Sequence, residues 1–83
     1  SDQYDVNLQI AGAPEKWEAL VRRAGANPRA FTLFYLQDGR VVAANTINNA
    51  RDMRFAKMLI ERGRVVEPER LADPAQKLQD LVR

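Results

Sequence analysis

The first third of the chain alternates between apolar and polar residues, a pattern typical of strands with one buried face. Val6, Leu8 and Ile10 are separated by polar residues, so they predict one face of a first strand, which the small residues at 11–14 would end. Residues 17–23 also alternate. A leucine that breaks this alternation would equally suit a helix, but we interpret the segment as a second strand.

The segment 31–36, Phe-Thr-Leu-Phe-Tyr-Leu, is apolar on both faces of a predicted third strand. One face carries Phe31, Leu33 and Tyr35, and the other carries Phe34 and Leu36. A strand of this composition is expected to be covered on both sides.

An Asp-Gly pair separates the third strand from a predicted fourth strand at residues 40–47. Both central residues of a two-residue type I′ turn need a positive φ, and Asp-Gly adopts this conformation readily. Asp38 and Gly39 therefore predict that the two strands form a β-hairpin.

A helix is predicted over residues 50–62. Asn48 or Asn49 can accept hydrogen bonds from its first N–H groups, and Asp52 follows Asn49 by three residues, as in a capping box. Gly63 suits the left-handed position that ends a helix. The apolar face carries Met53, Ala56, Leu59 and Ile60, with Phe55 at its margin. The opposite face carries Arg51, Arg54, Lys57 and Glu61.

The C-terminal segment predicts a short turn and one more helix. The turn is expected at residues 68–71. Asp73 would then be the N-cap of the last helix and Pro74 its first residue. The inward-facing side chains of this helix would be Leu78, Leu81 and Val82.

Together these elements predict an α+β fold, an antiparallel sheet of about four strands with C-terminal helices packed on one face. A chain of 83 residues is expected to form one domain, residues 1–83. Helices on one face would leave aromatic side chains of the third strand on the other. Either loops and sheet curvature cover that face, or the domain packs on a larger partner or on a second copy of itself.

The composition argues against most catalytic chemistry in this segment. Cysteine and histidine are both absent, so it has no thiol nucleophile, no disulfide and no imidazole base. Its aspartates are scattered, and its four glycines are too far apart for a phosphate-binding loop. We expect no metal site, no bound nucleotide cofactor and no catalysis by this segment alone.

Charge and hydropathy restrict the partners. The formal charge is only +2, and acidic residues interleave with the arginines that a nucleic-acid-binding module would use, Arg22, Arg23, Arg29, Arg40 and Arg51. No apolar run is long enough to span a bilayer or to act in a signal peptide. We expect a cytoplasmic protein that binds neither nucleic acid nor membrane. A free-standing protein-interaction or dimerisation domain fits these observations.

Four segments carry a resemblance to a known family. They are Ser-Asp-Gln-Tyr at 1–4, the first strand at 5–12, the stretch from the hairpin to the helix at 31–52, and Leu-Ala-Asp-Pro-Ala-Gln-Lys-Leu-Gln-Asp-Leu-Val at 71–82. In this order they resemble the C-terminal domain of FAD-dependent, NAD(P)H-linked ferredoxin reductases. That family includes putidaredoxin reductase, rubredoxin reductase and the reductase subunits of aromatic-ring dioxygenases.

The resemblance implies a role within a larger flavoprotein. Domains that bind FAD and NAD(P)H would precede this segment, and the parent protein would pass electrons from NAD(P)H through FAD to a two-iron ferredoxin that serves an oxygenase. In the family a Trp beside the flavin usually precedes Ser-Asp-Gln-Tyr, so the resemblance places Ser1, Asp2 and Gln3 nearest the flavin. The alternative is that these residues only fix the linker to the first strand.

The resemblance also implies a role for the polar face of the predicted helix. Arg51, Arg54 and Lys57 would form a basic stripe that steers an acidic ferredoxin toward the reductase. The alternative is a helix face that is only solvated.

Overall fold

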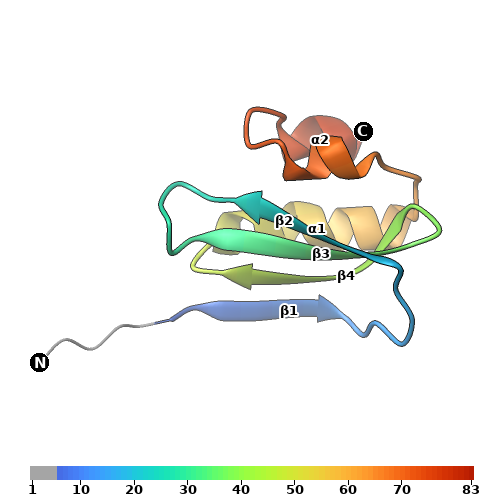
Figure 1. Cartoon of the computed structure of the whole chain (residues 1–83), viewed down its shortest axis with the longest axis horizontal. Coiled ribbons are helices and arrows are strands. Elements are labelled where there is room, and N and C mark those ends of the chain that lie inside the picture. Colours follow the sequence, from blue (N-terminus) through green and yellow to red (C-terminus); the bar gives the residue numbers. More distant parts are fainter. Residues whose placement is uncertain (1–5) are drawn as a thin grey trace, which may run out of the picture.

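Four antiparallel strands form one sheet in the order β1-β4-β3-β2, and three helices follow them in sequence (Figure 1). The structure, a computed structural model, describes residues 6–83. The strands are β1 (Leu8–Gly12), β2 (Ala19–Ala24), β3 (Phe31–Gln37) and β4 (Arg40–Ile47). The helices are α1 (Ala50–Arg62), α2 (Pro68–Ala72) and α3 (Leu78–Leu81). The predicted α+β fold is confirmed.

The β3–β4 hairpin has the predicted turn. Gln37 pairs with Arg40, which leaves Asp38 and Gly39 as the two turn residues, with φ values of 53° and 77°. Both values are positive, as a type I′ turn requires. The N–H of Val66 donates to the carbonyl of Gly39 at 2.8 Å, so the segment after α1 is attached to this turn.

The core lies between one face of the sheet and the helices. Phe34 and Leu36 of β3 are buried on this face, and α1 contacts β4 and β1 while α2 contacts β2. In Figure 1, α1 lies behind the sheet. The buried residues of α1 are Met53, Ala56 and Leu59, and Phe55 and Ile60 pack against the core from its margin. The predicted apolar face of this helix is therefore confirmed.

The start of α1 differs from the predicted capping box. Asn49 occupies the N-cap position, but its side chain makes no capping hydrogen bond. Its Nδ2 donates instead to Thr32 Oγ1 at 2.9 Å and to Asp52 Oδ2 at 2.8 Å. The side chain of Asn48 accepts a hydrogen bond from the N–H of Asn7 at 2.8 Å. The predicted N-cap position is confirmed for Asn49, but the predicted capping hydrogen bonds of the side chain were wrong, because each asparagine has a partner elsewhere in the chain.

The end of α1 is as predicted, whereas the start of the last helix is not. Gly63 has a φ of 58°, and its N–H donates to the carbonyl of Leu59 at 3.0 Å. The last helix begins at Leu78 instead of following an Asp73 cap. The side chain of Asp73 accepts a hydrogen bond from the N–H of Ala75 at 2.9 Å, which closes a local turn. The predicted inward residues of this segment, Leu78, Leu81 and Val82, are buried.

A buried arginine explains why a turn replaces the predicted helix start. Arg23, on the core face of β2, is 7% exposed. Its guanidinium donates to the carbonyls of Leu71 at 3.2 Å and Asp73 at 2.8 Å, and also to that of Gln76. Carbonyls that accept from Arg23 point toward β2, so the loop between α2 and α3 folds around this side chain.

The same guanidinium connects the loop to α1. Arg23 Nε lies 3.8 Å from Asp52 Oδ2, and that oxygen also accepts hydrogen bonds from Thr32 Oγ1 at 3.1 Å and from Asn49 Nδ2 at 2.8 Å. One carboxylate oxygen is therefore shared by side chains from β2, β3 and the start of α1. We call Arg23, Thr32, Asn49 and Asp52 the arginine network.

Removal of the buried guanidinium should destabilise the domain strongly. Arg23→Met would remove the buried donor to three carbonyls and the cation beside the Asp52 carboxylate, at a cost of about 3 kcal/mol. Arg22→Met is the matched control, because the neighbouring arginine is exposed and lies 4.7 Å from the Phe31 ring centroid, a contact that contributes about 1 kcal/mol or less. Urea denaturation followed by the fluorescence of Trp17, the single tryptophan, measures both. Equal midpoints for the two variants would contradict the role of the network.

Replacement of the turn glycine should also destabilise the domain. A Cβ at Gly39 would lie 3.0 Å from Val65 Cγ1, and the positive φ adds strain of at least about 1 kcal/mol. Gly39→Val is therefore expected to lower the thermal midpoint more than Gln37→Val, which places the same side chain within β3. Equal midpoints would mean that the turn tolerates a side chain.

Candidate partner-binding surface

The outward side of α1 carries the predicted basic stripe. Arg51, Arg54 and Lys57 are all exposed, and their spacing of three residues keeps them near one side of the helix. Within residues 6–83, no carboxylate lies within 4.0 Å of these three cations. Their charges are therefore available to a partner.

Apolar side chains border this stripe. Phe55 and Met58 are half-buried and pack against the core, and the guanidinium carbon of Arg54 lies 5.9 Å from the Phe55 ring centroid. A surface that combines exposed cations with a partly accessible aromatic ring can attract a partner over a distance and also contact it closely.

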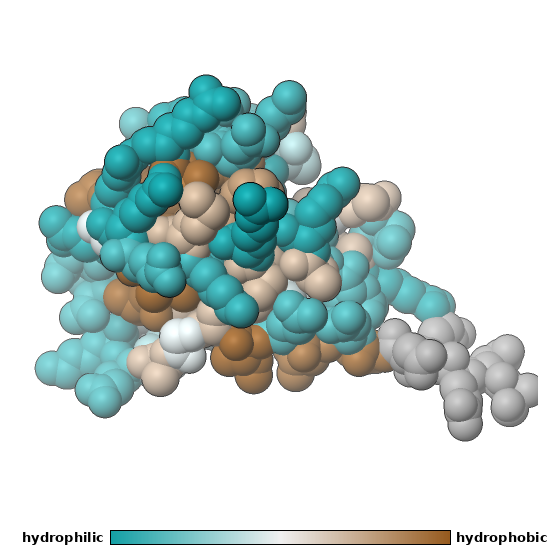
Figure 2. Space-filling model, turned by 180° about the vertical axis from the view of Figure 1, so that it is seen from behind, coloured by the Kyte–Doolittle hydropathy of each residue, from teal (hydrophilic) through white to brown (hydrophobic). Residues whose placement is uncertain are grey.

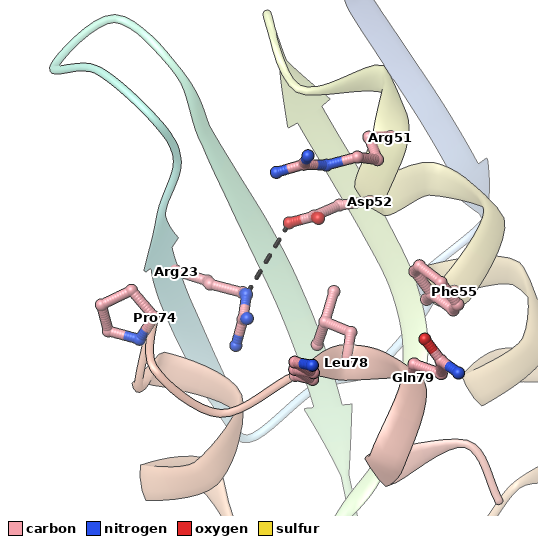
Figure 3. Close-up of a pocket in the computed structure, with 8 residues that line it drawn as sticks. Arg23, Arg51, Asp52, Phe55, Pro74, Leu78 and Gln79 are labelled. Carbon is pink, nitrogen blue, oxygen red and sulfur yellow. Dashed lines mark ion pairs between the residues drawn. The ribbon is translucent and has the colours of Figure 1, made fainter.

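A shallow pocket lies between α1 and the segment that leads into α3 (Figure 3). Arg51, Asp52 and Phe55 approach it from α1, and Lys77 adds a cation from the opposite side. In Figure 3 the guanidinium of Arg23 lies at the base and pairs with Asp52. The lining residues are Arg23, Arg51, Asp52, Phe55, Pro74, Lys77, Leu78 and Gln79.

A second pocket continues this surface toward the C-terminus. Its lining residues are Arg54, Phe55, Met58, Arg62, Gln79, Val82 and Arg83. Phe55 and Gln79 line both pockets. We call the area formed by α1 and α3 around Phe55 the α1–α3 surface. It is rich in cations. Asp52, the one carboxylate in the two linings, lies 3.8 Å from Arg23, and Asp80 of α3, outside both linings, lies 3.9 Å from Arg83.

The structure brings together some predicted site residues and adds others. Arg51 and Arg54 line the two pockets, whereas Lys57 lies on the exposed side of α1 outside both linings. Arg62, Lys77 and Arg83 were not predicted for this surface. Arg62 is in the last turn of α1 itself, whereas only the packing of α3 against α1 brings Lys77 and Arg83 close to the stripe. Ser1, Asp2 and Gln3 lie outside the described residues.

The described part of the chain offers little for other kinds of site. Among residues 6–83, no three His, Cys, Asp or Glu side chains gather as metal ligands would. None of the helices in that range has the length and apolar character to cross a membrane.

Comparison with known proteins identifies the family. Residues 1–82 match the family described as Reductase C-terminal. The chain belongs to this family. The resemblance to the C-terminal domain of ferredoxin reductases is thus confirmed over nearly the whole length of the chain.

Individual relatives carry the names of ferredoxin reductases. The domain is 42% identical over 80 residues, 95% of its length, to the ferredoxin–NAD(+) reductase component of an anthranilate 1,2-dioxygenase system from Burkholderia cepacia. It is 32% identical over 82 residues, 99% of its length, to putidaredoxin reductase from Pseudomonas putida. These matches cover 20% and 19% of the two relatives, so the domain spans about a fifth of their length.

Solved structures of reductases have the same fold. A covalent complex of putidaredoxin reductase with putidaredoxin matches with a TM-score of 0.84 and 32% identity, over 99% of this domain and 20% of that chain. A ferredoxin reductase from Rhodopseudomonas palustris matches with a TM-score of 0.83 and 29% identity, over 100% of this domain and 20% of that chain.

Reversal of charge on the α1–α3 surface should leave the fold intact. Arg51→Glu with Arg54→Glu changes two exposed side chains, and such changes usually alter the free energy of unfolding by about 0.5 kcal/mol or less. Leu59→Ala, on the buried side of the same helix, is expected to cost about 2–5 kcal/mol. Urea denaturation of the variants checks this. A large loss of stability in the double variant would mean that the stripe has a structural role.

Proposed function

We propose that this domain is the C-terminal part of a flavoprotein that passes electrons from NAD(P)H through FAD to a two-iron ferredoxin serving an oxygenase. The family match and the names of the relatives support this role. FAD and NAD(P)H would bind to preceding domains, and Ser1, Asp2 and Gln3 would lie near the flavin. We also propose a cytoplasmic location, where NAD(P)H is regenerated.

Within that protein, the domain contributes a docking surface for the ferredoxin. The observation that carries this proposal is the row of exposed cations Arg51, Arg54 and Lys57, which pair with no carboxylate of residues 6–83, beside the partly accessible Phe55. Two-iron ferredoxins are commonly acidic, so a basic surface raises the rate of encounter and orients the partner. The solved covalent complex of putidaredoxin reductase with putidaredoxin supports a direct contact between a reductase of this kind and its electron-accepting partner.

The test is electron transfer in the full-length reductase. With Arg51→Glu and Arg54→Glu, reduction of the native ferredoxin should slow at low ionic strength, and the difference from wild type should shrink as salt screens the charges. Reduction of the flavin by NAD(P)H should not change, because that step does not involve the ferredoxin. Stopped-flow absorbance separates the two steps.

The control is a charge reversal of equal size elsewhere. Arg64 and Arg70 are exposed and line neither pocket of the α1–α3 surface, so Arg64→Glu with Arg70→Glu changes the net charge equally. The proposal is wrong if the two double variants show the same salt dependence, because only net charge would then matter.

A further inference from the structure

The sheet face opposite α1 carries no helix within residues 6–83 and is mainly apolar (Figure 1). The strand register identifies its side chains, because directly paired residues point to the same face. One row contains Leu8, Ile47 and Phe31, and the next contains Ile10, Asn45, Leu33 and Arg22. A third row contains Ala43, Tyr35 and Leu20. We call these three rows the open face.

The apolar side chains of the open face remain accessible to a degree that is unusual for a sheet. Leu8, Ile10 and Leu20 are 56%, 63% and 53% exposed. Between them on β3 and β4, the larger side chains are only half-buried and the small Ala43 is buried, whereas Phe34 on the other face of β3 is 0% exposed. A contiguous apolar patch of this kind marks a surface that contacts another protein.

The apolar area reaches from β1 at one edge of the sheet to Trp17, just before β2, at the other. Figure 2 shows the molecule from the side that carries α1, which is mostly hydrophilic, with hydrophobic side chains along its lower edge, where Figure 1 places β1. At the other end, Trp17 stands edge-on to Tyr35 with ring centroids 5.4 Å apart. The patch therefore runs across all four strands.

The polar groups of the open face already have partners within the domain. Asn45 Nδ2 donates to the hydroxyl of Tyr35 at 2.9 Å, and the guanidinium of Arg22 lies over the Phe31 ring. The three rows contain no carboxylate. Burial of this face would therefore cost little at Asn45 and Tyr35, whereas the Arg22 guanidinium would need an acceptor from the part of the protein that covers it.

We infer that the open face is the surface on which the preceding part of the same reductase packs. This inference rests on the proposed function. The family description places the matched segment at the C-terminal end of a reductase, and the relatives are about five times as long as this domain. Most of such a reductase therefore precedes β1, whose exposed Leu8 and Ile10 belong to the open face. A chain that enters through β1 brings its preceding domains to this edge of the patch.

Hydroxyl-radical footprinting of the full-length reductase tests the inference directly. Leu8, Ile10 and Leu20 should be modified several-fold more slowly than Val65, after correction for intrinsic reactivity. Val65 is the matched reference, because it is 66% exposed and lies outside the open face. Modification of all four residues at similar rates would overturn the inference.

A variant tests whether the patch acts as one contact, and dilution separates packing within one chain from packing between copies. Ile10→Lys places a charge on β1, at one edge of the patch. It should raise the rate of modification of Leu20 on β2, at the opposite edge of the sheet, whereas Val65→Lys should leave that rate low. Protection that disappears on dilution, together with dissociation of a dimer in sedimentation experiments, would assign the face to a second copy and overturn the inference.

Failure of the proposed function would be distinguishable from failure of this inference. A reductase that protects the open face but reduces no ferredoxin with NAD(P)H would refute the electron-transfer role alone. A reductase that reduces ferredoxin normally while Leu8, Ile10 and Leu20 are freely modified would refute the inference alone.

Discussion

The hydrogen bonds of one buried arginine hold the C-terminal third of this domain in place. Helices of five and four residues, such as α2 and α3, are too short to be stable by themselves. Arg23 binds the carbonyls of the loop that joins them and pairs with Asp52 at the start of α1. The position of α3 beside α1, and with it the α1–α3 surface, therefore depends on a residue of β2. This surface is consequently built by parts of the chain that lie far apart in sequence.

The two candidate contact surfaces have opposite character and lie on opposite sides of the sheet. The α1–α3 surface is basic, and its exposed side chains are hydrated in the absence of a partner, so dissociation of the partner costs little free energy. The open face is apolar, which suits a contact that persists. If both assignments hold, this domain lies between a permanent neighbour and a transient one. The residues of β3 then serve both sides, because Phe34 supports the helices and Tyr35 belongs to the open face.

Local patterns in the sequence were sufficient for the hairpin and for α1, and insufficient where distant partners decide the structure. Asp38–Gly39 and Gly63 were predicted correctly because the preference for positive φ is a property of the residue itself. Asp73 was misread as a helix cap, and Asn49 occupies the predicted N-cap position without the predicted side-chain hydrogen bond. Asn49 bonds a threonine of β3, and the carbonyl of Asp73 accepts from Arg23. The sequence gives no local sign of either contact. The basic stripe on α1 followed from helical periodicity, but Lys77 and Arg83 could not be added without knowledge of how α3 packs.

The adjacent arginines of β2 have a consequence for how the sheet assembles. Within residues 6–83 this strand is at the edge of the sheet and pairs with β3 alone. Its backbone hydrogen bonds to one neighbour therefore provide little discrimination between the correct register and a shifted one. Arg22 points to the open face and Arg23 to the core. A slip of one residue would exchange the two faces, leaving Arg23 in solvent and the loop carbonyls without a donor. The side chain that organises the C-terminal loop thus also discriminates between alignments, and the strand cannot reach its correct pairing independently of a loop that follows it by some fifty residues.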